Sequence, residues 1–245
     1  MNTKLNKTKI LYFIFYICIF AFVFIWFNNV HQMIIFDGDD WTYSSYSRNL
    51  WPSTSMWNPA RVFPEIFMRL PASVGVYLLY PVTGDYIGSI STGFAFTLAV
   101  FITAYMVMFG KFSRERFQLS GVKTVISTVL FLLFHFSVFK SASSDNYYMF
   151  WSQNPTCVFY YLVSSLLNCI VLLYVAGRGI VNIVKEQGHY LKKGILVVMV
   201  YLAIFSNMYP SIILAVYSAD GRTRGCSSHC STECFLISGS QTSSI

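Results

Sequence analysis

Charged side chains are scarce in this sequence. Asp, Glu, Lys and Arg make up only 11% of its 245 residues, whereas hydrophobic residues make up 55%. An average soluble domain is roughly a quarter charged. This scarcity excludes an ordinary soluble globular domain, and it makes the position of each charge informative.

Common catalytic patterns are absent as well. The sequence has no glycine-rich nucleotide loop, no HExxH motif and no recognisable Ser-His-Asp set, so nucleotide-sugar chemistry is unsupported. Within its apolar runs the one ionisable side chain other than Tyr and Cys is His135, which we interpret as a structural histidine bonded to a neighbouring helix. Ion-coupled transporters usually carry charged groups at that depth. Binding or chemistry at the outer surface therefore fits the sequence better.

Long apolar runs dominate what is present. A bilayer-spanning helix needs about 20 apolar residues, and five segments approach that length. They are residues 10–27, 87–109, 125–139, 157–176 and 195–217. The patch at 73–82 is too short to span and contains Pro81, so we expect it to be re-entrant or interfacial. The predicted fold class is an all-α polytopic membrane protein with about five transmembrane helices, an uncleaved N-terminal anchor and a large outer loop at 28–86.

Lysine and arginine collect on one side of these predicted spans. Three lie in the N-terminal segment, four in residues 111–123 and four in residues 178–193. The opposite side has only Arg48, Arg61, Arg69 and Lys140. Because cytoplasmic loops accumulate such residues, we expect a cytoplasmic N-terminus. The net charge of +7 then faces anionic membrane lipids, and nucleic acid is not an expected partner.

The outer loop opens with three aspartates, Asp37, Asp39 and Asp40. One interpretation is a solvated turn around Gly38, with Asp40 capping the helix that follows. The other is a cleft at the membrane surface, where burial and like charge raise the pKa of a carboxylate enough for it to act as a base. The three carboxylates could also hold Mg²⁺ or Mn²⁺, although no histidine ligand lies close by.

The same loop supplies aromatic and basic groups that suit a sugar site. Trp41 and Tyr43 could stack on pyranose rings, whereas Trp51 and Trp57 fit an interfacial aromatic belt. Further along, a helix beginning near Pro64 would pair Glu65 with Arg69 and leave Arg61 for a phosphate. An ion pair between Arg61 and Glu65 is the alternative.

An N-terminal anchor, an outer loop that opens with "FDGDDW" and the later "NPARVFPE" resemble the polytopic bacterial glycosyltransferases of GT-C type. The greatest likeness is to phage-encoded O-antigen glucosyltransferases of the Gtr class, which determine serotype. The segments "YYMFWSQNPTCVFYYL" and "FSNMYPSIIL" are similar to a second outer loop and a later helix of that group, so the resemblance covers roughly residues 1–217. It implies the N-terminal part of a GT-C fold in a bacterial inner membrane.

The resemblance also implies a reaction. Glucose would pass from a polyprenyl-phosphate donor to lipid-linked O-antigen on the periplasmic side, with no cofactor beyond a conceivable divalent cation. Asp39 and Asp40 match the acidic pair of that family, and one of them would be the base. Glu65 would be an orienting group in the site, and Arg61 would contact the phosphate of the donor. Asp37, Trp41 and Tyr43 would complete the substrate site.

Residues 218–245 depart from that pattern. This tail has eight serines and three cysteines, and the apolar periodicity stops. Cys226, Cys230, Cys234 and His229 do not have a common zinc spacing. We expect a disordered or out-of-frame tail on a truncated enzyme that could be inactive.

Two alternatives to an enzyme stay open. A flippase or other transporter for lipid-linked sugars would need a polar path, for which Ser164, Ser165, Asn168, Asn207 and Pro210 are the candidates. These residues are equally typical of helix packing and a proline kink. A noncatalytic membrane protein is the other alternative, and it predicts that substitution of the aspartates changes nothing.

Overall fold

The computed structural model describes residues 2–35, 37–49, 51, 57–137, 149–179, 182–183, 188 and 190–219. Regular structure in these residues is helical throughout. Four helices are long and apolar enough to cross a membrane: Thr8–Val30, Val62–Thr83, Tyr86–Phe117 and Pro155–Arg178. These helices indicate a membrane protein, which agrees with the prediction from composition.

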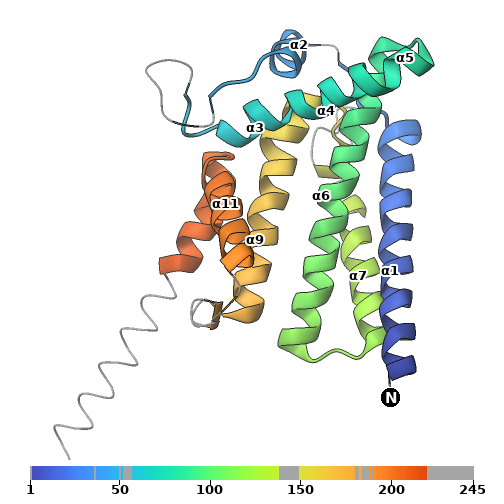
Figure 1. The fold of residues 1–245 in the computed structure, drawn as a ribbon, viewed down its shortest axis with the longest axis vertical. Coiled ribbons are helices and arrows are strands. Elements are labelled where there is room, and N and C mark those ends of the chain that lie inside the picture. Colours follow the sequence, from blue (N-terminus) through green and yellow to red (C-terminus); the bar gives the residue numbers. More distant parts are fainter. Residues whose placement is uncertain are drawn as a thin grey trace, which may run out of the picture.

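Five helices run roughly alongside one another and form a bundle (Figure 1). They are α1 (Asn2–Ile25), α6 (Tyr86–Phe117), α7 (Gly121–Ser137), α9 (Ser164–Arg178) and α11 (Tyr190–Ile204). Helix α6 contacts α1, α7 and α9, and α11 contacts α9. Their shared core is aliphatic and aromatic, with Phe94, Leu98 and Ile102 of α6 fully buried.

The bundle has two distinct ends (Figure 1). The end where α1 begins, which we call the N-terminal end, also holds the α6–α7 connection. The other end, which we call the loop end, carries α2 (Gly38–Ser45), η3 (Met149–Trp151) and the start of the α9 helix at α8 (Pro155–Cys157) and η4 (Val158–Val163). The described parts of the predicted outer loop 28–86 therefore gather at one end.

A nearly continuous helical rod crosses the loop end (Figure 1). It consists of α3 (Val62–Phe67), α4 (Arg69–Val74), η2 (Gly75–Leu79) and α5 (Tyr80–Thr83). Although it is long enough to span a membrane, it lies across the ends of α6 and α9 and not beside them. We therefore treat it as an interfacial helix outside the membrane-spanning segments.

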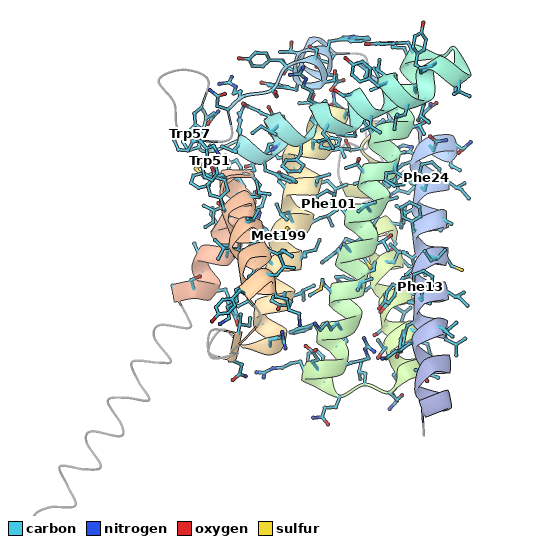
Figure 2. The ribbon with its side chains drawn as sticks, viewed as in Figure 1. Phe13, Phe24, Trp51, Trp57, Phe101 and Met199 are labelled. Atoms are coloured by element: carbon cyan, nitrogen blue, oxygen red, sulfur yellow. The ribbon has the colours of Figure 1, made fainter. Side chains whose placement is uncertain are left out.

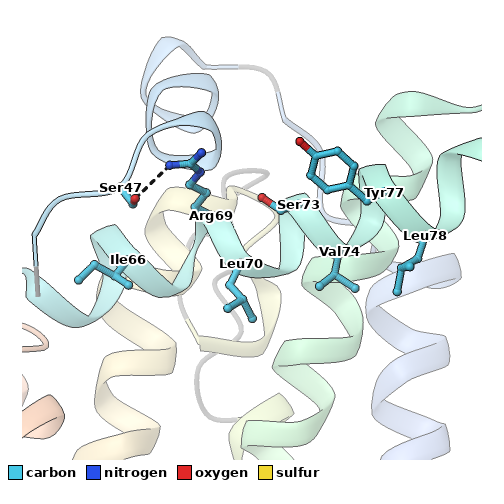
Figure 3. Close-up of a pocket in the computed structure, with 8 residues that line it drawn as sticks. All are labelled: Ser47, Ile66, Arg69, Leu70, Ser73, Val74, Tyr77 and Leu78. Carbon is cyan, nitrogen blue, oxygen red and sulfur yellow. Dashed lines mark hydrogen bonds between the residues drawn. The ribbon is translucent and has the colours of Figure 1, made fainter.

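The side chains of the rod fit this interpretation. Leu70, Val74 and Leu78 are exposed and project toward the bundle side of the rod, while Arg69, Ser73 and Tyr77 project the opposite way (Figure 3). A spacing of four residues places each set along one face of a helix. An apolar face toward the membrane and a polar face away from it are typical of a helix in the interface plane.

Two glycines allow the rod to lie directly on α6. A Cβ atom added at Gly93 would overlap the carbonyl oxygen of Pro71, and one added at Gly75 would overlap the carbonyl oxygen of Ser89. The backbones of α4, η2 and α6 are therefore in contact, as small residues permit in membrane helix packing. This close approach fixes the rod at its position on the loop end.

One predicted span overlaps a single helix and another does not. The span 125–139 overlaps the apolar helix Gly121–Ser137, which is 17 residues long, and its last two residues lie outside the described ones. The predicted span 195–217 is not one helix. Residues 205–207 are not helical, and they separate α11 from a second helix, Met208–Ala219. In Figure 1 this second helix turns back beside α11. Pro210 cannot donate a backbone hydrogen bond, which favours a new helix start at this point.

Polar residues inside the bundle serve helix packing. Asn168 Nδ2 donates to the carbonyl oxygen of Ala203 at 3.1 Å and to Ser206 Oγ at 2.9 Å, which ties α9 to the end of α11. Asn207 Nδ2 donates to the carbonyl oxygen of Tyr160 at 2.9 Å. His135 bonds the carbonyl oxygen of Phe131 in its own helix, at 2.7 Å, and its ring stacks on Phe150. The expected bond of His135 to a neighbouring helix stays a prediction, and its ring packing on Phe150 joins α7 to η3.

Candidate functional site

The three aspartates of the outer loop occupy different environments. Asp37 stands at the N-cap of α2, and Asp39 and Asp40 lie in the first turn of that helix. Asp37 and Asp39 are exposed, whereas Asp40 is fully buried. The helix begins at Gly38, so the expected turn around this glycine is a helix start. Asp37 at the N-cap and Asp40 at the third helical position form a reciprocal capping box.

Asp40 connects two segments that are far apart in the sequence. Its Oδ1 atom accepts hydrogen bonds from the backbone N–H of Thr156 at 3.0 Å and from the Thr156 hydroxyl at 2.5 Å. Its Oδ2 atom accepts one from the backbone N–H of Asp37 at 3.3 Å. Because donors of the chain itself occupy this carboxylate, it is a poor acceptor for the proton of a substrate. We assign Asp40 a structural role, the attachment of α2 to the start of the α9 helix.

Asp39 and Trp41 face outward from α2. The Asp39 side chain is exposed, and Trp41 is 43% exposed. Tyr43, on the same helix, is half-buried with its ring centroid 5.0 Å from that of Tyr160. Of the predicted substrate residues on α2, Tyr43 is thus the one that packs against the bundle.

Glu65 is the buried acid of the loop end. Its side chain is 1% exposed, and its Oε2 atom forms an ion pair with Nε of Arg48 at 2.5 Å. The predicted partner, Arg69, instead donates a hydrogen bond from Nη1 to Ser47 Oγ at 3.0 Å (Figure 3). The prediction of a Glu65–Arg69 pair was wrong because Arg69 lies on the outer face of the rod, while Glu65 is buried beneath it.

Burial raises the pKa of the Glu65 carboxyl above its usual range, and the nearby Arg48 guanidinium counteracts part of this effect. The Tyr160 hydroxyl and the Arg61 guanidinium also favour the charged form. The Tyr160 hydroxyl therefore neighbours the buried carboxyl, although among the described residues neither it nor Oε1 of Glu65 meets a hydrogen-bond partner of good geometry. Buried polar atoms in such loose contact suggest a position for a ligand hydroxyl.

Arg61 completes this site from the N-cap of α3. Its guanidinium carbon lies 5.4 Å from the ring centroid of Tyr160, a cation–π contact. We call Tyr43, Arg48, Arg61, Glu65 and Tyr160 the Glu65 cluster. It combines one buried carboxyl, two guanidinium groups and two phenol rings, so it could exchange a proton and hold an anion.

Arg48 and Tyr160 are the members of the cluster that sequence reasoning did not identify. Arg48 was one of the few cations on the predicted outer side of the membrane. It lies 17 positions before Glu65, however, and no local spacing links the two residues. Tyr160 falls within an apolar helix, where an aromatic residue is typical of the core. Their contact with Glu65 depends on the tertiary arrangement.

Metal binding finds no support in this region. No three His, Cys, Asp or Glu side chains within the described ranges are arranged so that they could hold a metal ion. The cysteines and histidine of the tail lie outside the described residues.

Trp51 and Trp57 lie near the tip of α11 at the loop end (Figure 2). The Trp51 ring is 5.5 Å from the ring of Tyr201, and the Trp57 ring is 5.9 Å from that of Phe205. Trp51 therefore packs against α11 and Trp57 against the break that follows this helix, at the end of the bundle where an interfacial aromatic belt would lie.

No protein-family model matches the chain, and no curated protein or solved structure matches it either.

Proposed function

We propose that this chain is a membrane glycosyltransferase, or part of one, that works at the loop end with Glu65 as its general base. One observation carries the proposal: a buried carboxyl with a raised pKa lies beside two arginines at the end of an apolar bundle. A base is most effective when its pKa approaches the working pH. The glucose, polyprenyl-phosphate donor and O-antigen acceptor come from the sequence resemblance alone.

The cluster suits the proton and charge movements of such a transfer. Glu65 would accept the proton of an acceptor hydroxyl while that oxygen attacks the anomeric carbon of the donor sugar. The bond between this carbon and the phosphate oxygen breaks, and the phosphate leaves with the electron pair. Arg48 and Arg61 would stabilise the resulting negative charge.

The ion pair with Arg48 has a place in this sequence of events. Arg48 compensates the charge of Glu65 through their ion pair. A donor phosphate would compete for Arg48 and leave the carboxylate free to act as a base.

The transporter alternative receives less support from the contacts. Asn168 and Asn207, two of the candidates for a polar path, donate hydrogen bonds that join helices of the bundle. These two side chains therefore serve helix packing, which was the other interpretation of the same residues in the sequence. A noncatalytic membrane protein remains the second candidate, and activity assays separate it from an enzyme.

The test is to express the chain in cells that make both O-antigen and polyprenyl-phosphate glucose, and to measure glucose in the O-antigen by mass spectrometry. Glu65→Gln should lower incorporation by at least about 100-fold, the usual contribution of a general base. Asp39→Asn, a matched removal of one carboxylate charge, should keep most of the activity. Thermal unfolding in detergent checks that both variants fold.

Two outcomes would reject the proposal. If the unmodified chain is inserted in the membrane and incorporates no glucose, the chain is not an active transferase. If Glu65→Gln retains full incorporation at equal protein level, Glu65 is not the base.

A further inference from the structure

The N-terminal end of the bundle has a pocket that the proposed reaction does not use. It has a volume of about 330 Å³ and is lined by residues of α6, α9 and α11. Three cations from the three different helices line it, Lys111, Arg178 and Lys192. The pocket therefore combines charges that are distant in the sequence.

The remaining wall of this pocket is apolar. Met108, Ile170, Val171, Ile195, Leu196 and Met199 line it. Met199, which is labelled in Figure 2, belongs to α11. On α11, Lys192 and the apolar lining residues follow at intervals of three and four residues, so they share one helix face. The pocket thus has cationic groups near the helix ends and an apolar wall that continues along the bundle.

Tyr174 contacts two of these cations. Nζ of Lys111 and Cζ of Arg178 lie 5.4 Å and 5.9 Å from its ring centroid, and Arg178 donates a hydrogen bond to its hydroxyl at 3.2 Å. Within the described ranges, Glu115 reaches this group at 3.9 Å from Nζ of Lys111, with both side chains more than a third exposed. Such an exposed pair contributes little to stability, so Lys111 can exchange this partner for a ligand.

Helix dipoles explain only part of this arrangement. Arg178 lies in the last turn of α9, where a positive charge is favoured, whereas Lys111 lies more than one turn before the end of α6. Lys192 lies in the first turn of α11, where the dipole disfavours a positive charge. An external anion in the pocket would account for the position of Lys192 as well.

We propose that this pocket binds one anionic phospholipid from the membrane leaflet at the N-terminal end. Its phosphate contacts Lys111, Arg178 and Lys192, and the upper part of an acyl chain lies along the apolar wall. Charge complementarity and the adjoining apolar surface select a phospholipid, because basic pockets between membrane helices are suited to anionic headgroups. A zwitterionic lipid brings a cation of its own and fits less well.

The experiment is a titration of the full chain in detergent with phosphatidylglycerol or phosphatidylcholine, with bound lipid counted by native mass spectrometry. We expect one retained phosphatidylglycerol and little phosphatidylcholine. The double variant Lys111→Gln/Lys192→Gln should weaken phosphatidylglycerol binding by about tenfold or more. The double variant Arg116→Gln/Lys123→Gln removes the same charge from the same end, outside the pocket, and should bind as the unmodified chain does.

A second pair of variants tests the apolar wall without any change of charge. Ile195→Trp fills the pocket and should reduce lipid retention, whereas Val197→Trp, on the same helix but outside the lining, should not. Soluble glycerol phosphate should not replace the lipid at equal concentration.

Three results would overturn the proposal. Equal losses in the two double variants would mean general surface attraction. Equal binding of both lipids would remove the anionic preference. Tight binding of glycerol phosphate, or full retention in Ile195→Trp, would show that the apolar wall takes no part.

Discussion

The two ends of this bundle use charge in opposite ways. At the loop end, Asp40 and Glu65 are buried and paired with groups from distant segments, Thr156 and Arg48. At the N-terminal end, Lys111 and Lys192 are at least partly exposed and line a pocket between helices. Buried charges must be compensated within the chain, whereas charges at a pocket mouth can be compensated by a ligand or a lipid. Substitutions at the loop end should therefore affect folding and activity, and those at the other end should affect lipid binding.

The largest expected effect comes from the close contact between the rod and α6. Gly93→Ala places a methyl group against the Pro71 carbonyl and should lower the free energy of unfolding by about 3 kcal/mol, because backbone must move. Gly194→Ala is the matched control. A Cβ atom there meets nothing within 4 Å, so the change should be neutral or stabilising by up to about 1 kcal/mol.

Denaturant unfolding in detergent micelles measures both glycine variants. If the two variants are equally stable, the backbone of the rod is not in close contact with α6.

The second effect concerns the attachment of α2. Asp40→Ala leaves the Thr156 N–H and hydroxyl without their acceptor and should cost about 2 kcal/mol. Hydrogen exchange should accelerate at the Thr156 amide and in α2, while Asp39→Ala leaves exchange unchanged. Unchanged protection in Asp40→Ala would restore Asp40 as a candidate for catalysis.

A smaller effect is expected between α9 and α11. Asn168→Leu removes the bonds to Ala203 and Ser206 and should cost about 1 kcal/mol, the usual range for such bonds between membrane helices. Amide exchange in α11 should rise, and Ser165→Ala serves as the control on the same helix. A faster exchange in the control alone would mean that Asn168 does not hold α11.

The smallest effect is a pH dependence from Glu65. Since burial raises its pKa in the folded chain, the folded state binds this proton more tightly than the unfolded state. Stability from this group is then greatest below the ordinary pKa of Glu, about 4.3, and falls as pH rises through the folded value. Glu65→Gln should flatten that part of the profile of melting temperature against pH, and an unchanged slope would contradict the burial effect.

Local sequence rules predicted part of this molecule well. Apolar runs with few charges predicted the start of α6 and both ends of the α9 helix within a few residues, because burial in lipid requires that composition over a fixed length. Helix α6 continues beyond the predicted end at residue 109 to Phe117, through a charged segment. The same rules failed at residues 205–207, where Ser206 and Asn207 interrupt an otherwise apolar run and the helix breaks. Hydropathy measures polarity and does not register a bend.

The site was predicted less well, because its residues come from segments that are separated in the sequence. The sequence identified Glu65 and Arg61 as chemically able residues, but it paired Glu65 with Arg69 by helical spacing. In the folded chain Arg69 lies on the outer face of the rod and bonds Ser47, and Arg48 reaches the carboxyl from a preceding segment. A pair that forms across such a distance has no local signature.

The sequence by itself determined that this chain is helical and apolar, and it determined where its charges lie, because both follow from composition over short windows. Only the tertiary structure decided what each charge does. Asp40 and Asp39 are adjacent in the same helix, yet one is buried against Thr156 and the other faces outward. Burial and partner identity depend on which segments pack together, and that packing arises from contacts between residues far apart in the chain.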